Sequence, residues 1–153
     1  MKHTKKQLAL CYALLTMILA FIWGNSAMPG ETSGALSGWL GDLVGKVLPF
    51  FTTEQGGHIL RKLAHFSEFA ALGAVLGWLF GMIARKPLWQ RALPLLCGAA
   101  AACIDETIQI YSPGRHCSII DVCIDCSGVL TGTLILTVLY YLICHLKNKN
   151  GAE

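Results

Sequence analysis

The chain has 153 residues, with 12 basic and 9 acidic side chains and a formal net charge of +3 at pH 7. Hydrophobic residues make up 54% of the chain and charged residues only 14%, and the mean hydropathy is +0.55. Soluble domains carry roughly 25% charged residues, so this composition excludes a soluble globular protein. No nucleic acid is expected as a partner.

Apolar runs in chain order predict four membrane helices. A helix that crosses a hydrocarbon core of about 30 Å needs about 17 to 25 mostly apolar residues. Runs of this kind occupy about 8–23, 59–83, 92–111 and 119–144. The third run is the least apolar, because it contains Asp105 and Glu106. We therefore expect an all-α integral membrane bundle of four transmembrane helices, with a single domain covering 1–153.

The first run also has the layout of a signal peptide. A basic start precedes its apolar middle, and the small residues of "GNSAMPG" follow. Cleavage there would leave three spans with the same outer face. The sequence leaves both interpretations open.

Basic residues gather in three short flanks, namely "MKHTKK" at the start, "ARKPLWQR" at 84–91 and "HLKNKN" at 145–150. Basic flanks are retained in the cytoplasm, so both termini are expected there. The loop 24–57 is more acidic than basic and is expected outside. Arg61 and Lys62 lie at the outer end of the second span, against this rule, unless partners hold them there.

Ionisable and amide side chains recur at the outer ends of the last three spans. An α-helix turns 100° and rises 1.5 Å per residue. At these spacings Arg61, His65 and Glu68 fall on one stripe of the second span, and the polar residues of the third span and of the fourth span each share one face. The second span carries Arg61, Lys62, His65 and Glu68, the third carries Asp105, Glu106 and Gln109, the fourth carries Asp121 and Asp125, and the Pro-Gly turn between the last two carries Arg115.

A charge inside a bilayer costs from about 2.5 to more than 10 kcal/mol and normally faces the interior of a helical bundle. We therefore predict that these ten residues line one polar pocket that opens to the outer surface. Five of them are carboxylates and three are Lys or Arg, which leaves two negative charges unbalanced. A protonated carboxyl, a charged His65, a bound cation or a ligand would restore the balance.

Small residues predict close packing between helices. Gly73, Gly77 and Gly81 repeat at spacings of four in the second span, and Gly128 and Gly132 do so in the fourth. Such repeats let neighbouring membrane helices approach closely.

Two further interpretations compete for the polar residues and cysteines. His65 and Glu68, with nearby carboxylates, favour Mg²⁺ or Mn²⁺ over zinc, but H-x-x-E lacks the second histidine of zinc-protease helices, so no metal is assigned. Cys123 and Cys126 form a C-x-x-C at a place used by quinone-linked thiol oxidases. The pair points away from the acidic face, and buried cysteine usually packs as a small apolar residue. Cys117 is the most exposed candidate for reactivity.

Three segments together resemble the signature blocks of the VanZ-like family, namely "RKLAHFSEF", "DETIQIYSPGR" and "DVCIDCSGVLTG". The segment "NSAMPGETSGALSG" is similar to the first outer loop of that family. The resemblance spans about residues 20–144. It implies that the polar set of the family falls on Lys62, His65, Glu68, Asp105, Glu106, Gln109, Arg115, Asp121 and Asp125.

The resemblance also implies a small multi-pass protein of the bacterial plasma membrane, in a family whose name-giving member is associated with low-level teicoplanin resistance. One expected function is binding of a membrane lipid, a lipid-linked cell-wall intermediate or a lipoglycopeptide, with Arg61, Lys62 and Arg115 holding the anion. The alternative is a hydrolase or transferase on such lipids that uses His65, Glu68 or Glu106. No catalytic residue, cofactor or oligomeric state is assigned.

Overall fold

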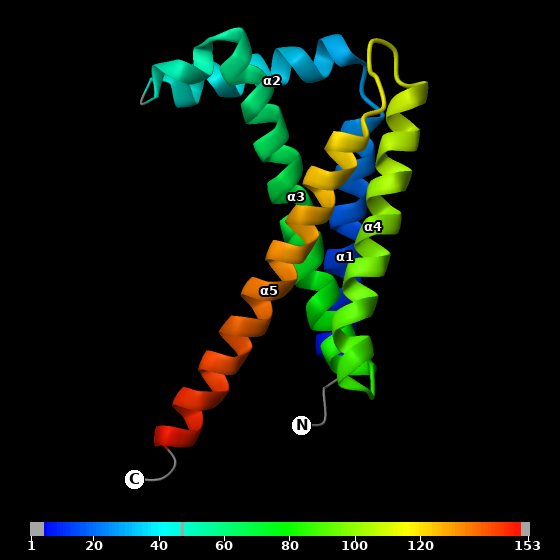
Figure 1. Cartoon of the computed structure of the whole chain (residues 1–153), viewed down its shortest axis with the longest axis vertical. Helices are drawn as coiled ribbons and strands as arrows, with labels where there is room; N and C mark the ends of the chain where they lie inside the picture. Colours follow the sequence, from blue (N-terminus) through cyan, green and yellow to red (C-terminus); the bar gives the residue numbers. More distant parts are fainter. Residues whose placement is uncertain (1–4, 47, 151–153) are drawn as a thin grey trace.

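The computed structural model describes residues 5–46 and 48–150, and every regular element within them is a helix. The elements are α1 (Lys5–Ser26), α2 (Gly30–Gly45), the short 3₁₀ helix η1 (Pro49–Thr52), α3 (Glu54–Ile83), α4 (Pro87–Tyr111) and α5 (Ile119–Asn150). Figure 1 shows α1, α3, α4 and α5 running along the length of the molecule and α2 lying across one end.

The prediction of four membrane helices is confirmed. Four helices in the described part of the chain are long and apolar enough to cross a membrane, namely Lys5–Ser26, Glu54–Ile83, Pro87–Tyr111 and Ile119–Lys147. Each is longer than its apolar run, because hydrogen bonding along the backbone continues through the polar residues at its ends. The protein is therefore a bundle of membrane helices.

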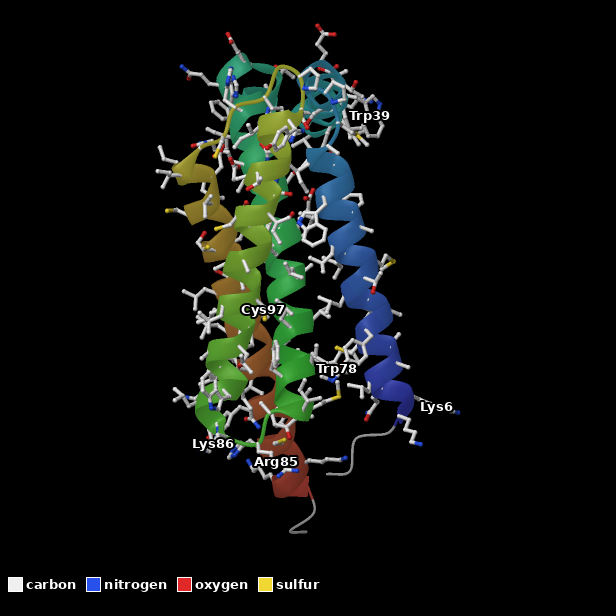
Figure 2. All side chains as sticks on the ribbon, turned by 90° about the vertical axis from the view of Figure 1, so that its right-hand side faces the viewer. Lys6, Trp39, Trp78, Arg85, Lys86 and Cys97 are labelled. Carbon is white, nitrogen blue, oxygen red and sulfur yellow. The ribbon has the colours of Figure 1, made fainter. Side chains whose placement is uncertain are left out.

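Both chain ends lie at the same end of the bundle. In Figure 1, α1 begins and α5 finishes at the end opposite α2. Figure 2 shows Lys6, Arg85 and Lys86 at that end and Trp39 of α2 at the other. The assignment of the basic end to the cytoplasm stays a prediction, and residues 1–4 of the basic start lie outside the described residues.

The region expected only as an outer loop, 24–57, is largely helical, because it contains α2 and η1. Its many glycines and serines give no strong helical signal, which is why the sequence did not reveal α2. Leu36, Trp39 and Leu43 are exposed on α2. A helix with exposed apolar side chains that lies across the end of a membrane bundle fits the bilayer interface.

The closest helix contact is the crossing of α3 and α5. A Cβ atom at Gly73 would collide with the backbone of Val129, and one at Gly132 would collide with the backbone of Ala70. Thr133 Oγ1 donates a hydrogen bond of 3.1 Å to the carbonyl oxygen of Gly73. The glycines therefore bring the two backbones into direct contact, as small residues do in membrane bundles.

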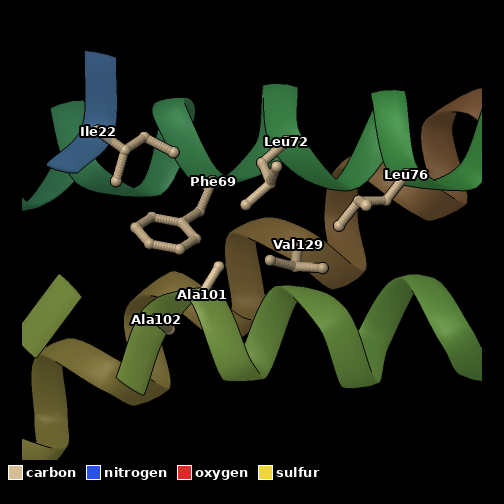
Figure 3. Close-up of a cluster of buried hydrophobic side chains, with 7 residues drawn as sticks. All are labelled: Ile22, Phe69, Leu72, Leu76, Ala101, Ala102 and Val129. Atoms are coloured by element: carbon tan, nitrogen blue, oxygen red, sulfur yellow. The ribbon is translucent and has the colours of Figure 1, made fainter. Parts of the chain in front are cut away.

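The hydrophobic core lies beside this crossing and combines all four long helices. Figure 3 shows its buried members, which are Ile22 of α1, Phe69, Leu72 and Leu76 of α3, Ala101 and Ala102 of α4, and Val129 of α5. Ile22 and Ser26 are buried, so the end of α1 next to α2 packs into the bundle interior. The core begins directly after Glu68 of α3 and so closes the inner side of the polar region.

Gly132→Ala should destabilise the protein by about 1 to 3 kcal/mol, because the added methyl group would force α3 and α5 apart. Gly81→Ala is the matched control, since a Cβ atom at Gly81 would meet nothing within 4 Å. The control should be neutral or stabilising by up to about 1 kcal/mol through helix propensity. Unfolding of the two variants in detergent would measure both effects. Equal destabilisation by both would contradict the close crossing.

Candidate functional site

The polar residues at the α2 end of the bundle surround a cavity of about 290 Å³, called here the polar cavity. Eight of the ten predicted residues line it, namely Arg61, Lys62 and His65 of α3, Glu106 and Gln109 of α4, Arg115 of the connecting turn, and Asp121 and Asp125 of α5. Of the other two, Asp105 is completely buried and Glu68 lines an adjoining groove. The structure thus brings the predicted residues of α3, α4 and α5 to one end of the bundle.

Asp105 is held in a fixed orientation by two donors. Ser26 Oγ and Gln109 Nε2 each donate a hydrogen bond of 2.8 Å to its Oδ2 atom. Ser26 belongs to α1, so this contact joins α1 to α4. The Oδ1 atom of Asp105 is buried and has no hydrogen-bond partner among the described residues.

Two further carboxylates are buried in the wall of the cavity. Glu106 is 2% exposed, and its Oε2 atom accepts a 2.8 Å hydrogen bond from the backbone N–H of Ser118. Asp125 is 1% exposed, and neither of its oxygens has a hydrogen-bond partner in the described part of the chain. Buried charges in native proteins are normally paired or bind metals, so an ionised Asp125 would require a partner from outside the chain.

The basic residues of the site differ in how they are held. Lys62 Nζ lies 3.3 Å from Asp121 Oδ1. This ion pair explains how Lys62 is accommodated at this end of α3. Both side chains remain partly exposed, and such pairs contribute only about 0 to 1 kcal/mol to stability.

Arg115 is 6% exposed, and its three guanidinium nitrogens have no hydrogen-bond partner among the described residues. The turn that carries it needs Gly114 in the left-handed region, with φ of 73°. Burial, together with the nearby charge of Arg61, lowers the pKa of Arg115, while Asp105, Glu106 and Glu68 raise it. An arginine remains protonated in proteins, so the polar cavity contains a cation with free donors.

A second cavity of about 470 Å³ adjoins the polar cavity and is mainly apolar. We call it the apolar groove, and its lining comes from α1, α2, α3 and the connection between α1 and α2, with Ala20, Phe21, Met28, Leu36, Trp39, Leu40 and Ala64 among its members. Arg61 and His65 line both the groove and the polar cavity. Glu68 lies in the groove, and Asn25 Nδ2 donates a 3.3 Å hydrogen bond to its Oε1 atom.

Sequence reasoning missed four polar residues of the site, which are Asn25, Ser26, His58 and His116. Asn25 and Ser26 directly follow the first apolar run, and their polar side chains at that position could have indicated a contact with the polar site. The small residues around them were assigned to a signal-peptide pattern instead. His58 lies two helical turns before His65, so the polar stripe of α3 begins earlier than predicted.

The seven cysteines are all free. Cys126 packs against the hydrophobic core, and neither it nor Cys123 lines the polar cavity. Desolvation, together with Glu106, raises the pKa of the Cys117 thiol. A raised pKa reduces the thiolate fraction and hence reactivity, so the structure gives no support to thiol chemistry at this site.

Ser26→Ala should destabilise the protein by about 1 to 3 kcal/mol, because a buried carboxylate would lose one of its two donors. Thr16→Ala is a matched control, since the hydroxyl of Thr16 is exposed and bonds only to the carbonyl oxygen of Tyr12 in its own helix. The melting temperatures of both variants in detergent would test this. An unchanged value for Ser26→Ala would contradict the role of Ser26 as an anchor for Asp105.

The comparisons with known proteins agree with the motifs on which the site is built. No curated protein and no solved structure matches the chain. The family model described as VanZ/LLP1 matches residues 10–141, which include all four long helices in whole or large part and every residue of the candidate site. With its four apolar helices, the chain is a multi-pass membrane protein of the VanZ/LLP1 family.

Proposed function

We propose that the protein binds an anionic membrane lipid, with the phosphate of the headgroup in the polar cavity and the hydrocarbon tail in the apolar groove. The main support for this proposal is that Arg61 and His65 line both the polar cavity and the apolar groove. Lipids have this same division between a charged and an apolar part. Ligand sites in general combine an apolar lining with a few placed polar groups.

Arg115 is the main candidate for the phosphate contact. Its guanidinium is buried without a partner, and the planar fork of arginine matches two phosphate oxygens at once. Arg61 and Lys62 line the same cavity and add positive charge. The preferred ligand therefore carries phosphate or pyrophosphate at the junction between headgroup and tail.

The carboxylates of the cavity favour a headgroup that also carries amines or hydroxyls. Glu106 and Asp125 line the cavity, and each has at least one unpartnered oxygen. An ionised carboxylate accepts hydrogen bonds but cannot donate them. These oxygens therefore require a ligand that carries hydrogen-bond donors. A phospholipid with an amine, or a lipid-linked cell-wall intermediate with sugar hydroxyls, meets both demands.

Charge distribution supports a location at the outer leaflet of a bacterial plasma membrane. Lys6, Arg85 and Lys86 lie at the end of the bundle opposite the cavity (Figure 2). Membrane proteins keep such residues in the cytoplasm. Trp39, at the end with the cavity, is of the residue type enriched at membrane interfaces.

Binding is favoured over catalysis by the composition of the cavity wall. Among the residues described, the polar cavity is lined by no serine, threonine or cysteine, so its wall offers no hydroxyl or thiol nucleophile. Of the predicted acid-base groups, Glu106 and Glu68 each have one oxygen already bound by a protein donor. Release of a product from a bound lipid by the purified protein would establish the hydrolase alternative instead.

Arg115→Gln should remove most of the lipid that co-purifies with the protein, because the phosphate would lose a charge-assisted pair of hydrogen bonds. Such contacts contribute about 1.5 to 3 kcal/mol, equivalent to about a 10- to 150-fold loss of affinity. Arg91→Gln is the matched control, since Arg91 is exposed at the other end of the bundle. Native mass spectrometry of both variants would measure retained lipid. Equal retention would contradict the proposal.

The same proposal includes a role in tolerance of glycopeptides that carry a lipid tail. The polar cavity and the apolar groove would contact such a drug, or its lipid-linked target, in the same way as a membrane lipid. Expression in a susceptible bacterium should raise the inhibitory concentration of teicoplanin more than that of a glycopeptide without a tail. Ala64→Phe, which narrows the apolar groove, and Arg115→Gln should both abolish the difference. Tolerance that persists in both well-expressed variants would contradict this role.

A further inference from the structure

Three side chains of the polar site, each from a different helix, converge closely enough to share one ion. His65 of α3, Asp105 of α4 and Asp125 of α5 each offer a donor atom, and these atoms lie within 4.8 Å of one another. Asp105 is 0% exposed and Asp125 is 1% exposed, so water does not freely reach their carboxylates.

Donor atoms of these three side chains are left without partners within the protein. His65 Nδ1, Asp105 Oδ1 and both oxygens of Asp125 are buried without a hydrogen bond among the described residues. Arg115 does not satisfy them, since its guanidinium nitrogens are also unpartnered. An ionised carboxylate that is buried without a partner costs several kcal/mol. A cation between the free oxygens of Asp105 and Asp125 and the imidazole of His65 would offset this cost.

We propose that His65, Asp105 and Asp125 bind a divalent transition-metal ion. Two carboxylates balance the charge of one such ion. The sequence favoured Mg²⁺ or Mn²⁺, but with only two carboxylates beside the imidazole in the three-residue set the structure favours a transition metal over Mg²⁺ and Ca²⁺. Mn²⁺ and Zn²⁺ both accept this mixture of nitrogen and oxygen ligands. The site assigned earlier to a lipid headgroup thus contains an ion site that does not depend on lipid binding.

An ion would draw the three donor atoms closer together. Metal bonds to imidazole nitrogen and carboxylate oxygen are about 2.1 Å long, so neighbouring donors around a tetrahedral ion are about 3.4 Å apart. The three donor atoms lie within 4.8 Å of one another. Side-chain rotations that move the donor atoms by about 1 Å would bring all three onto one ion, with the remaining positions left for water or a phosphate oxygen.

Two hydrogen bonds in the structure already fix the orientation of one of the ligands, Asp105. Ser26 Oγ and Gln109 Nε2 both bond to Oδ2 of Asp105, which leaves Oδ1 as the free donor atom. Outer partners of this kind orient metal ligands, and their loss typically reduces metal affinity about 10- to 100-fold. Ser26 would thus have a role in ion binding although it does not touch the ion.

The test uses the full chain purified in detergent, stripped with a chelator and then equilibrated separately with Mn²⁺ and with Zn²⁺. We expect one ion per chain by elemental analysis and a rise in melting temperature as the ion concentration increases, because binding to the folded state stabilises it. Free Mn²⁺ should also lose its six-line electron paramagnetic resonance signal when protein is added. Failure of both ions to bind at up to about 1 mM, the weak end of the range for biological Ca²⁺ sites, would overturn the proposal.

Variants separate the ion site from the rest of the polar cavity. Asp125→Asn and His65→Gln should each reduce affinity at least about 100-fold, and Ser26→Ala about 10-fold, given the usual effect of losing such an outer partner. Asp42→Asn is the matched control, since Asp42 is an exposed carboxylate of α2 that lines neither cavity. It should bind the ion like the wild type. Wild-type affinity in Asp125→Asn, or equal losses in Asp125→Asn and Asp42→Asn, would show that the ion binds elsewhere or without specificity.

Arg115→Gln distinguishes this proposal from the proposed function. That variant should lose lipid but keep the ion, because Arg115 is not one of the three ligands. Loss of lipid binding in Arg115→Gln with retained ion supports both proposals. If the wild-type protein binds the ion but no lipid, the ion site is supported and the proposed function is not. If the protein binds lipid but has no affinity for the ion, the ion site alone is overturned.

Discussion

Hydrocarbon does not solvate charge, and this constraint explains where the ionisable residues of the protein lie. Acidic and basic side chains from α3, α4 and α5 converge on one interior region, because a helix surface facing lipid would leave each of them without a partner. Asp105 and Asp125 illustrate the result, as both are almost fully buried within the bundle. The protein thus maintains a polar interior at one end and a mainly apolar one beyond it.

The close crossing of α3 and α5 makes this arrangement possible. Gly128 and Gly132 lie against the backbone of α3 at Phe66 and Ala70, directly after the acidic residues of α5. With the backbones in contact there, the distance between the two helices at His65 and Asp125 is set by the packing beneath them. Close-packed helices resist small displacements, and rigid elements hold the geometry of a site better than loops do.

The sequence predicted most of the membrane architecture because apolar length has a direct physical meaning in a bilayer. It also predicted which polar residues would converge, since helical spacing places His65, Glu68 and their counterparts on interior faces. It did not predict α2, whose glycines and serines have low helix propensity and whose helix is fixed by contacts with the rest of the fold. Nor could it pair Ser26 with Asp105, because that hydrogen bond joins residues far apart in the chain. Gly81 shows the opposite error, since it repeats the packing pattern but meets no neighbour.

The backbone N–H of Gly30, at the start of α2, donates a 2.9 Å hydrogen bond to the carbonyl oxygen of Pro113. Pro113 is two residues before Arg115, and a side chain at Gly30 would collide with Gly114. α2 is therefore linked through backbone contacts to the turn that presents the guanidinium. A tilt of α2 would be transmitted through these contacts to that turn, so the position of the Arg115 guanidinium depends on how α2 lies across the end of the bundle.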